Sequence, residues 1–255
     1  MNVEQLFTNN NTLLFQQEIG GCLLEVKETE HYRWFEYNGH SIQSLMSKVN
    51  PKQVIMPVSQ SLLLFLLLDN QHKKILNLGL GGASLERALV SIPNLHITSI
   101  EASQPIIDMA KRYFYLPGKV DVICQQAEQF VESIKAKYDV VLCDLFIGEK
   151  SPDFLFTEYF YKQLCEITTE KAVLSLNIKA QNNQQLLKML LIIKKHFINI
   201  AIIEFDNYSN IVILCSHEMI PKQSVLQQRL ANFTQIGLSG LEKTIDKMTY
   251  IPINQ

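Results

Sequence analysis

Residues 75–89 read ILNLGLGGASLERAL and contain the strongest indication of the fold. An apolar run ends in Gly79, Gly81 and Gly82, three glycines within four positions, and a helix-like pattern follows at once. Glycine loses more backbone freedom on folding than any other residue, so three together need a structural reason. Either they only form a tight strand-to-helix turn, or they also let the backbone approach a bound ligand closely.

Apolar runs rich in β-branched residues alternate with helix-length segments on both sides of this turn. The expected strands cover residues 75–79, 97–100, 120–123, 139–143 and 172–178. The helix-length segments cover residues 84–91, 104–115, 126–136, 157–168 and 182–197. Strands that alternate with helices predict right-handed crossovers and a largely parallel sheet with both faces covered. The expected fold class is therefore α/β.

The alternation ends near residue 199. Two further apolar runs, at residues 199–206 and 210–216, are separated by only a few residues. No crossover helix fits in that gap, so these two strands should be antiparallel neighbours. The result is a seven-stranded, mostly parallel sheet that ends in an antiparallel hairpin. This order resembles the Rossmann-like class I S-adenosylmethionine-dependent methyltransferase fold.

The regions before and after the alternating segment have different patterns. Residues 22–47 contain short β-rich runs, with Asn38-Gly39 as a hairpin turn between two of them. They predict a small N-terminal β-hairpin unit over residues 1–50, ahead of a nucleoside-binding domain over residues 51–255. A leucine-rich helix is expected at about 60–69, and residues 221–250 read as helical.

Composition excludes several classes of function. The net charge is −2 with no long basic run, which argues against a nucleic-acid partner. Leu62–Leu68, the most lipid-like segment, is far shorter than the roughly 20 residues that a membrane span needs. The start of the chain lacks the features of a secretory signal. Five dispersed cysteines without CxxC spacing indicate reduced thiols in a cytoplasmic protein. Six scattered histidines predict no metal site.

Polar side chains at the ends of the expected strands are the candidate site residues. In an open α/β sheet, ligands bind at the carboxyl ends of the strands, where the glycine turn lies. Glu101 ends the second strand, twenty residues after Gly81, which suits a carboxylate that binds two ribose hydroxyls. Gln126 follows the third strand and either reaches an adenine edge or only starts a helix. Asp144 ends the fourth strand and is either a functional acid or a loop anchor.

These residues and their surroundings resemble the spermidine synthase (polyamine aminopropyltransferase) family over about residues 22–217. ILNLGLGGASLERAL is similar to the family's glycine-rich turn, and SIEASQPIIDMAKRYF to its ribose-acid strand and following helix. YDVVLCDLF and FLFTEYFYKQL resemble the fourth strand, the active-site loop and the next helix. In the N-terminal YNGHSIQSLM, Gln43 falls where the family has a glutamine in the nucleoside pocket.

The resemblance implies a reaction and an assembly. Such synthases transfer an aminopropyl group from decarboxylated S-adenosylmethionine to a diamine, and they form dimers and larger assemblies. Asp144 matches the aspartate that accepts the amine proton. An amine must lose a proton and be aligned before it attacks, which is why carboxylates surround it in the family.

Other positions depart from the family. Gly82 stands where the family has an aspartate that holds the donor's amine, and Ile147 replaces a second aspartate. Gln126 replaces an aspartate that contacts adenine, and no tyrosine occurs between Tyr37 and Tyr113, where the family has a catalytic one. The nucleoside half of the site is therefore expected to be intact, and ordinary putrescine is not the expected acceptor.

Three functions remain open from the sequence. The first is a spermidine-synthase-like transferase with an altered acceptor, held by Glu149, Asp153 or Glu158 unless these only form a solvated loop. The second is an S-adenosylmethionine-dependent methyltransferase, because a glycine at position 82 would leave room for the methionine carboxylate. The third is a non-catalytic protein that binds a nucleoside or acts through protein contacts.

Overall fold

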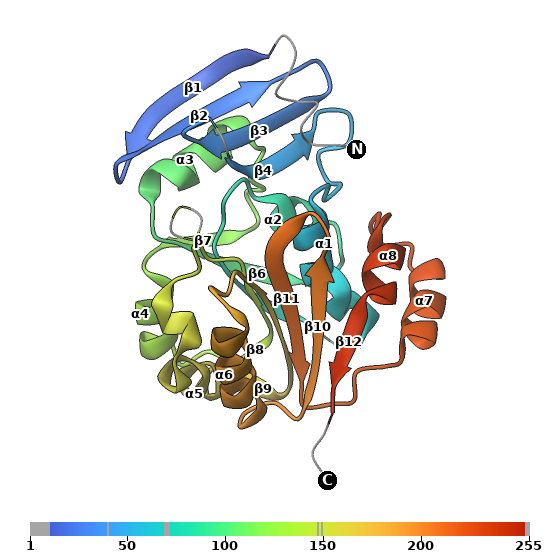
Figure 1. Cartoon of the computed structure of the whole chain (residues 1–255). Coiled ribbons are helices and arrows are strands. Elements are labelled where there is room, and N and C mark those ends of the chain that lie inside the picture. Colours follow the sequence, from blue (N-terminus) through green and yellow to red (C-terminus); the bar gives the residue numbers. More distant parts are fainter. Residues whose placement is uncertain (1–10, 40, 69–71, 147, 149, 253–255) are drawn as a thin grey trace.

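The computed structural model describes residues 11–39, 41–68, 72–146, 148 and 150–252. These residues form two β-sheets, a four-stranded one in the order β1-β2-β3-β4 and an eight-stranded one in the order β12-β10-β11-β9-β8-β5-β6-β7. Figure 1 shows the smaller sheet at one end of the molecule, next to α3 and beyond the edge of the larger sheet. The α/β class and the methyltransferase-like fold expected from the sequence are confirmed.

The N-terminal sheet is antiparallel throughout. Its strands are β1 (Thr12–Ile19), β2 (Cys22–Glu28), β3 (Tyr32–Tyr37) and β4 (Ser41–Ser47). Asn38 and Gly39 both have positive φ, 51° and 71°, in the turn between β3 and β4, as the hairpin prediction requires. Strand β1 was not expected. Its signal is the pair Gly20-Gly21, also at positive φ, which forms the turn to β2.

The large sheet contains the predicted parallel strands and the predicted hairpin. Strands β5 to β9 run parallel, and β9, β11 and β10 are antiparallel neighbours in turn. The strands are β5 (Lys74–Leu78), β6 (His96–Glu101), β7 (Asp121–Cys124), β8 (Tyr138–Cys143), β9 (Thr168–Ile178), β10 (Asn199–Phe205) and β11 (Tyr208–Ser216).

The C-terminal region adds an eighth strand that the sequence does not predict. It forms α7 (Gln223–Ala231), α8 (Leu241–Asp246) and then β12 (Met248–Ile251), which pairs antiparallel with β10. Four residues are too few to establish an alternating pattern, so the helical interpretation of the tail was wrong at its end. The strand extends the sheet beyond the predicted hairpin.

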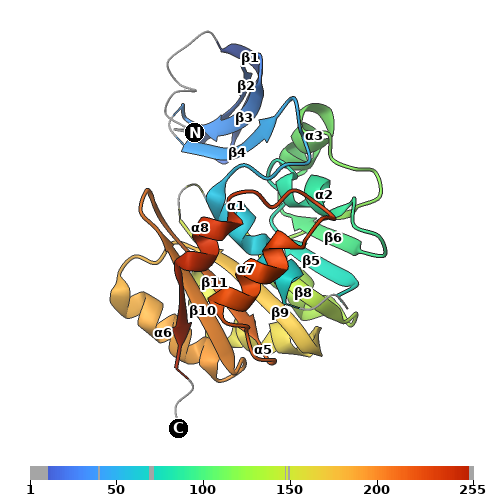
Figure 2. The ribbon, with the colours of Figure 1, turned by 90° about the vertical axis from the view of Figure 1, so that its right-hand side faces the viewer.

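Helices cover both faces of the large sheet (Figures 1 and 2). One face packs against α4, α5 and α6, and the other against α1, η2, α2, α7 and α8. The leucine-rich segment is shorter than expected as an α-helix and continues as a 3₁₀ turn, but all its leucines from 62 to 67 are buried. The remaining bounds are α1 (Pro57–Leu62), η2 (Leu63–Leu67), α2 (Ser84–Leu89), α3 (Gln104–Tyr113), α4 (Ala127–Ser133), η3 (Asp153–Phe156), α5 (Glu158–Glu166) and α6 (Asn183–Lys194).

The N-terminal sheet and α3 share a hydrophobic cluster, which positions the sheet over the carboxyl ends of the parallel strands. Its fully buried members are Leu24, Val26, Phe35, Met46, Ile106, Met109 and Phe114. Arg33 adds a hydrogen bond, donating from Nη1 to the carbonyl oxygen of Tyr113 at 2.6 Å.

Among the described residues, no helix has the length and apolar character that crossing a bilayer requires.

Candidate functional site

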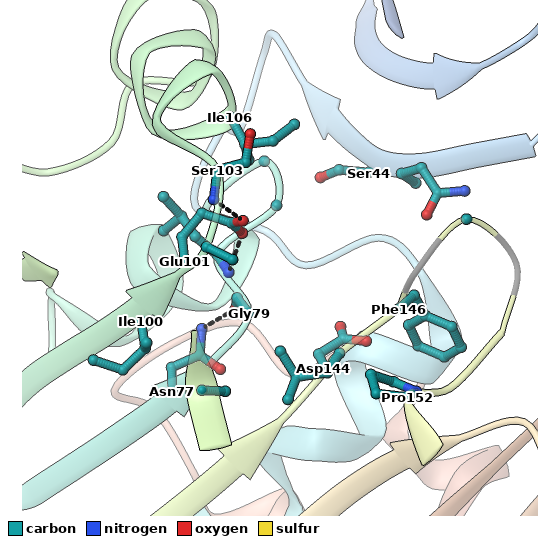
Figure 3. Close-up of a pocket in the computed structure, with 18 of the residues that line it drawn as sticks. Ser44, Asn77, Gly79, Ile100, Glu101, Ser103, Ile106, Asp144, Phe146 and Pro152 are labelled. Carbon is teal, nitrogen blue, oxygen red and sulfur yellow. Dashed lines mark hydrogen bonds between the residues drawn. The ribbon is translucent and has the colours of Figure 1, made fainter. Parts of the chain in front are cut away.

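A cavity of about 550 Å³ lies where the glycine turn, the ends of β6 and β8 and the N-terminal sheet meet. Figure 3 shows Glu101 and Asp144 on opposite sides of Gly79 in this cavity. The seven residues predicted to bind the donor or to act as the base all line it, so the fold brings them together from five separate segments. They are Gln43, Gly79, Gly81, Gly82, Glu101, Gln126 and Asp144.

Two of the turn glycines have a backbone reason to be glycine. Gly79 has a φ of 97°, and a Cβ there would lie 2.2 Å from the carbonyl oxygen of Asp144. Gly81 has a φ of 50°, a conformation that side chains disfavour. The turn continues into Ala83, which is buried and has a φ of 53° although it is not glycine. Strained backbone of this kind is concentrated at functional sites.

Gly82 has a different reason to be glycine, because its φ is not positive. A Cβ at Gly82 would lie 2.3 Å from Oγ and 2.7 Å from Cβ of Ser44, which comes from strand β4. Ser44 Oγ also lies 3.2 Å from Ser84 Oγ, within hydrogen-bonding distance. The space beside Gly82 is thus filled by Ser44, so the prediction that this glycine leaves room for a methionine carboxylate was wrong. Both residues line the cavity.

Glu101 is held by backbone amides of the glycine turn and of the segment that follows it. Its Oε2 accepts from the amide of Leu80 at 3.3 Å, and its Oε1 accepts from the amide of Ser103 at 3.0 Å (Figure 3). Burial raises the pKa of this carboxyl, and the backbone N–H groups of Ser103, Leu80 and Gly81 oppose that rise. The side chain is therefore fixed in orientation at the cavity wall.

A buried arginine supports the turn from behind. Arg87, only 3% exposed, donates to the carbonyl oxygens of Pro51 and Phe114, each at 2.7 Å, and also to that of Gly82. Burial lowers the pKa of its guanidinium to about 10. Its position in the fold links the glycine turn to the end of α3 and to the segment before α1.

Asp144 follows strand β8 at the centre of the sheet edge. Its amide donates to the carbonyl oxygen of Leu78 at 2.8 Å, and its Oδ1 accepts from Asn177 Nδ2 at 2.8 Å. Burial raises the pKa of the Asp144 carboxyl, and the bond from Asn177 opposes the rise. A carboxyl with a raised pKa in a cavity is suited to accept a proton.

The cavity also has lining residues that sequence reasoning missed. Tyr37, Ser44, Ser59 and Asn77 are the polar ones of most interest. Burial, with a further contribution from the nearby Glu101, raises the pKa of Tyr37 to about 12, so its hydroxyl stays protonated. Tyr37 and Ser44 belong to the N-terminal sheet, and no local pattern in the sequence connects them with a crevice in another sheet.

The three acids proposed to hold an acceptor have different positions. Asp153 lines the cavity. Glu158 does not, and instead forms an exposed ion pair with Lys195 at 2.7 Å. Glu149 lies outside the described residues.

No group of three or more metal-binding side chains occurs in the described part of the chain.

The sheet order and the cavity at the glycine turn define a protein of the class I methyltransferase fold. A crystal structure of a probable spermidine synthase from Corynebacterium glutamicum has this fold too, with a TM-score of 0.75 at 15% identity, over 94% of this chain and 90% of that one. Residues 64–213, more than half of the chain, match the family model described as the spermine/spermidine synthase domain. The chain belongs to the spermine/spermidine synthase family.

Curated relatives carry a more specific description. A polyamine aminopropyltransferase from Chromobacterium violaceum is 27% identical over 158 residues, covering 60% of this chain and 60% of the relative. One from Vibrio vulnificus is 28% identical over 181 residues, covering 68% of this chain and 58% of the relative. The matched region therefore spans about 60% of the length of these relatives.

Proposed function

We propose that this protein transfers a group from an S-adenosylmethionine-type donor to a nucleophilic acceptor. In this proposal the donor, decarboxylated S-adenosylmethionine or S-adenosylmethionine itself, binds at Gly79–Ser84 and Glu101, with Gln43 and Gln126 also in contact. Asp144 accepts the proton of the acceptor. The observation that carries the proposal is that Glu101 and Asp144 face one cavity from opposite sides of the glycine turn in a member of this family.

The charge of the cavity supports a cationic donor. Its described lining includes the carboxyls of Glu101, Glu128, Asp144 and Asp153, and no lysine, arginine or histidine. A cleft lined by one sign of charge raises the local concentration of ligands of the opposite sign. The donor carries a positive sulfonium, and an amine acceptor is also cationic before it loses its proton.

The proposed chemistry is a single displacement. The acceptor nitrogen forms a bond to the carbon next to the sulfonium, and the carbon–sulfur bond breaks with its electron pair left on sulfur. With the decarboxylated donor the products are methylthioadenosine and an aminopropylated amine. The proton that the nitrogen loses goes to Asp144, and holding the reactants in line supplies much of the rate enhancement.

The acceptor is proposed to be an amine other than ordinary putrescine. The relatives are described as polyamine aminopropyltransferases. This chain lacks an aspartate at position 147, and no tyrosine occurs between Tyr37 and Tyr113. Asp153 is the additional carboxyl in the cavity lining that we propose to hold the cationic end of the acceptor. The homodimer expected from the family resemblance and the cytoplasmic location expected from the dispersed cysteines stay predictions.

Methyl transfer is the second candidate, and the pair Gly82–Ser44 favours it. With Ser44 beside Gly82, the neutral hydroxyls of Ser44 and Ser84 stand at this part of the cavity. Neutral hydroxyls tolerate the carboxylate of the donor's methionine part, whereas an aspartate side chain at position 82 would repel it. In that case the methyl carbon is attacked and S-adenosylhomocysteine is the product.

The test is calorimetric titration of S-adenosylmethionine, its decarboxylated form and methylthioadenosine into the protein. Binding should weaken about ten- to a hundredfold in Glu101→Gln, because charge-assisted hydrogen bonds to the ribose would be lost. Glu132→Gln, at an exposed position on α4, is the matched control and should bind as the wild type does. Tighter binding of the decarboxylated donor supports aminopropyl transfer, and tighter binding of the full donor supports methyl transfer.

Turnover is then measured by mass spectrometry with a panel of amines. Asp144→Asn should keep nucleoside binding and lose about 10²- to 10⁴-fold in rate, the usual contribution of a general base. If none of the three nucleosides binds, the transferase proposal is wrong and the non-catalytic reading replaces it.

A further inference from the structure

Asp144 stands at the end of a chain of hydrogen bonds that crosses three strands. Asn177, at the end of β9, donates from Nδ2 to Oδ1 of Asp144 at 2.8 Å. Asn210, on β11, donates from its own Nδ2 to Oδ1 of Asn177 at 2.9 Å. Asn177 is 5% exposed, whereas Asn210 is half-buried. The two asparagines do not line the cavity, but they reach its candidate base from the strands beside it.

The second link matches the direction of the first. An asparagine amide has a carbonyl acceptor on one side and two N–H donors on the other. An ionised carboxylate only accepts hydrogen bonds, so the donor side of Asn177 faces Asp144 and its carbonyl side accepts from Asn210. If the Asn177 amide alone were rotated, its oxygen would lie against the carboxylate and its N–H groups against those of Asn210, and both bonds would be lost.

The N–H group of Asn177 provides a large share of the stabilisation of the Asp144 carboxylate, because no positive charge lies nearby in the described cavity lining. Besides Asp144, the titratable groups that line the cavity are the carboxyls of Glu101, Glu128 and Asp153, the phenol of Tyr37 and the thiol of Cys22. The thiol of Cys143 directly precedes Asp144 on β8. None of them offers a positive charge. Burial raises the pKa of Asp144, and the bond from Asn177 acts against that rise.

We propose that Asn177, oriented by Asn210, is a positioning residue that keeps the Asp144 carboxylate ionised and fixes its orientation in the cavity. This inference rests on the proposed function, in which Asp144 accepts the acceptor's proton. Asn177 itself touches neither donor nor acceptor. It acts by holding Oδ1 of Asp144, so that the other oxygen is the one that takes the proton.

The first test measures the ionisation of Asp144 directly, without turnover. Protein with ¹³C-labelled aspartate carboxyls is titrated with acid and followed by NMR, and Asp144→Asn identifies the resonance. In Asn177→Leu the midpoint for Asp144 should rise by about one to two pH units, the size expected for a lost hydrogen bond to a charged group. Asn210→Ala, at a half-buried position, should give a smaller rise in the same direction.

Ser175→Ala is the matched control. Ser175 lies two residues before Asn177 on β9, is fully buried, and its Oγ has no hydrogen-bond partner among the described residues. Removing this hydroxyl should leave the midpoint of Asp144 unchanged. An unchanged midpoint in Asn177→Leu, with methylthioadenosine still bound at wild-type affinity, overturns the inference.

The second test is the pH profile of kcat/KM with the best acceptor. The acid limb should move to higher pH in Asn177→Leu, by the same amount as the NMR midpoint, with the rate recovered above the new limb. A uniform loss at all pH values would mean a structural role and would contradict the inference. If the NMR midpoint moves but the wild type transfers no group to any acceptor, the proposed function fails while the electrostatic link between Asn177 and Asp144 stands.

Discussion

At the scale of single residues, the contact between Gly82 and Ser44 accounts for a departure from the family pattern. The resemblance places an aspartate at position 82, whereas here the oxygen of Ser44 occupies the region that its Cβ would need. Ser44 comes from the N-terminal sheet and Gly82 from the turn after β5. The two residues are therefore in contact, and the effect of a substitution at position 82 on stability should depend on which residue stands at position 44.

This pairing predicts the outcome of a double-mutant cycle. Gly82→Ala should destabilise the protein by about 1–3 kcal/mol, because the new methyl group would overlap Ser44. Ser44→Gly removes both overlapping atoms, so the double variant should recover most of the loss that Gly82→Ala causes. Urea unfolding of the four proteins measures the coupling, which is expected at about 0.5–3 kcal/mol for residues in contact.

Gly118→Ala is the control for this cycle. Gly118 does not have a positive φ, and a Cβ there would meet no atom within 4 Å, so its change should stay within about 0.5 kcal/mol. Strict additivity of Gly82→Ala and Ser44→Gly would show that Ser44 does not restrict position 82.

A site residue can be predicted from the sequence when it lies at a strand end, but not when it reaches the cavity from a separately packed sheet. Glu101 ends a strand and Gln126 and Asp144 come just after strands, so the fold rule for strand ends is enough to place them at one edge. Asn177 also lies near a strand end, so the same rule could have found it. Tyr37 and Ser44 could not be found in this way, since they reach the cavity only because a second sheet packs on α3.

At the scale of elements, Arg87 holds the glycine turn against two other segments. Arg87→Met keeps an apolar stem of similar length but removes the donors to the carbonyl oxygens of Pro51, Gly82 and Phe114. Buried carbonyls left without a donor cost about 1–3 kcal/mol each, partly offset because a buried cation is removed. We expect a net loss of about 3 kcal/mol in urea unfolding, and weaker binding of methylthioadenosine in calorimetry.

Two further variants separate geometry from charge. Arg87→Lys keeps the positive charge but not the planar fork, so it should recover only part of the loss. Arg112→Met, on the exposed side of α3, should change stability by less than about 0.5 kcal/mol. Full recovery in Arg87→Lys would mean that charge, and not the three directed hydrogen bonds, supports the turn.

The elements themselves were predictable where their patterns are long. The parallel strands and the hairpin of β10 and β11 are confirmed, because buried β-branched runs and a short connection constrain the possibilities. Strand β12 has only four residues, and its place in the sheet comes from pairing with β10 rather than from its own pattern. Short edge elements of this kind depend on tertiary contacts that local sequence does not contain.

At the scale of the whole molecule, the question is whether the two sheets unfold together. The N-terminal sheet is attached through both of its faces. Phe35 and its neighbours pack on α3, with the Phe35 and Phe114 rings 5.9 Å apart, and Trp34 packs on the opposite face with Ile55 and Met56. A small sheet alone buries little apolar surface, so most of its stability should come from these contacts.

We therefore expect one cooperative transition, and the chain contains a probe for each part. Trp34 is the single tryptophan and is completely buried in the N-terminal sheet, so its fluorescence reports on that sheet. Every described helix lies from Pro57 onward, so circular dichroism at 222 nm reports mainly on the remainder. In urea, the two signals should have the same midpoint and slope, which is the test for two-state unfolding.

Met109→Ala, in the shared cluster on α3, should lower both midpoints together by the equivalent of about 2–5 kcal/mol. If the fluorescence transition came first, the division into units at residues 1–50 and 51–255 would describe independently stable parts, and the cavity would lose Tyr37, Gln43 and Ser44 before the large sheet unfolds.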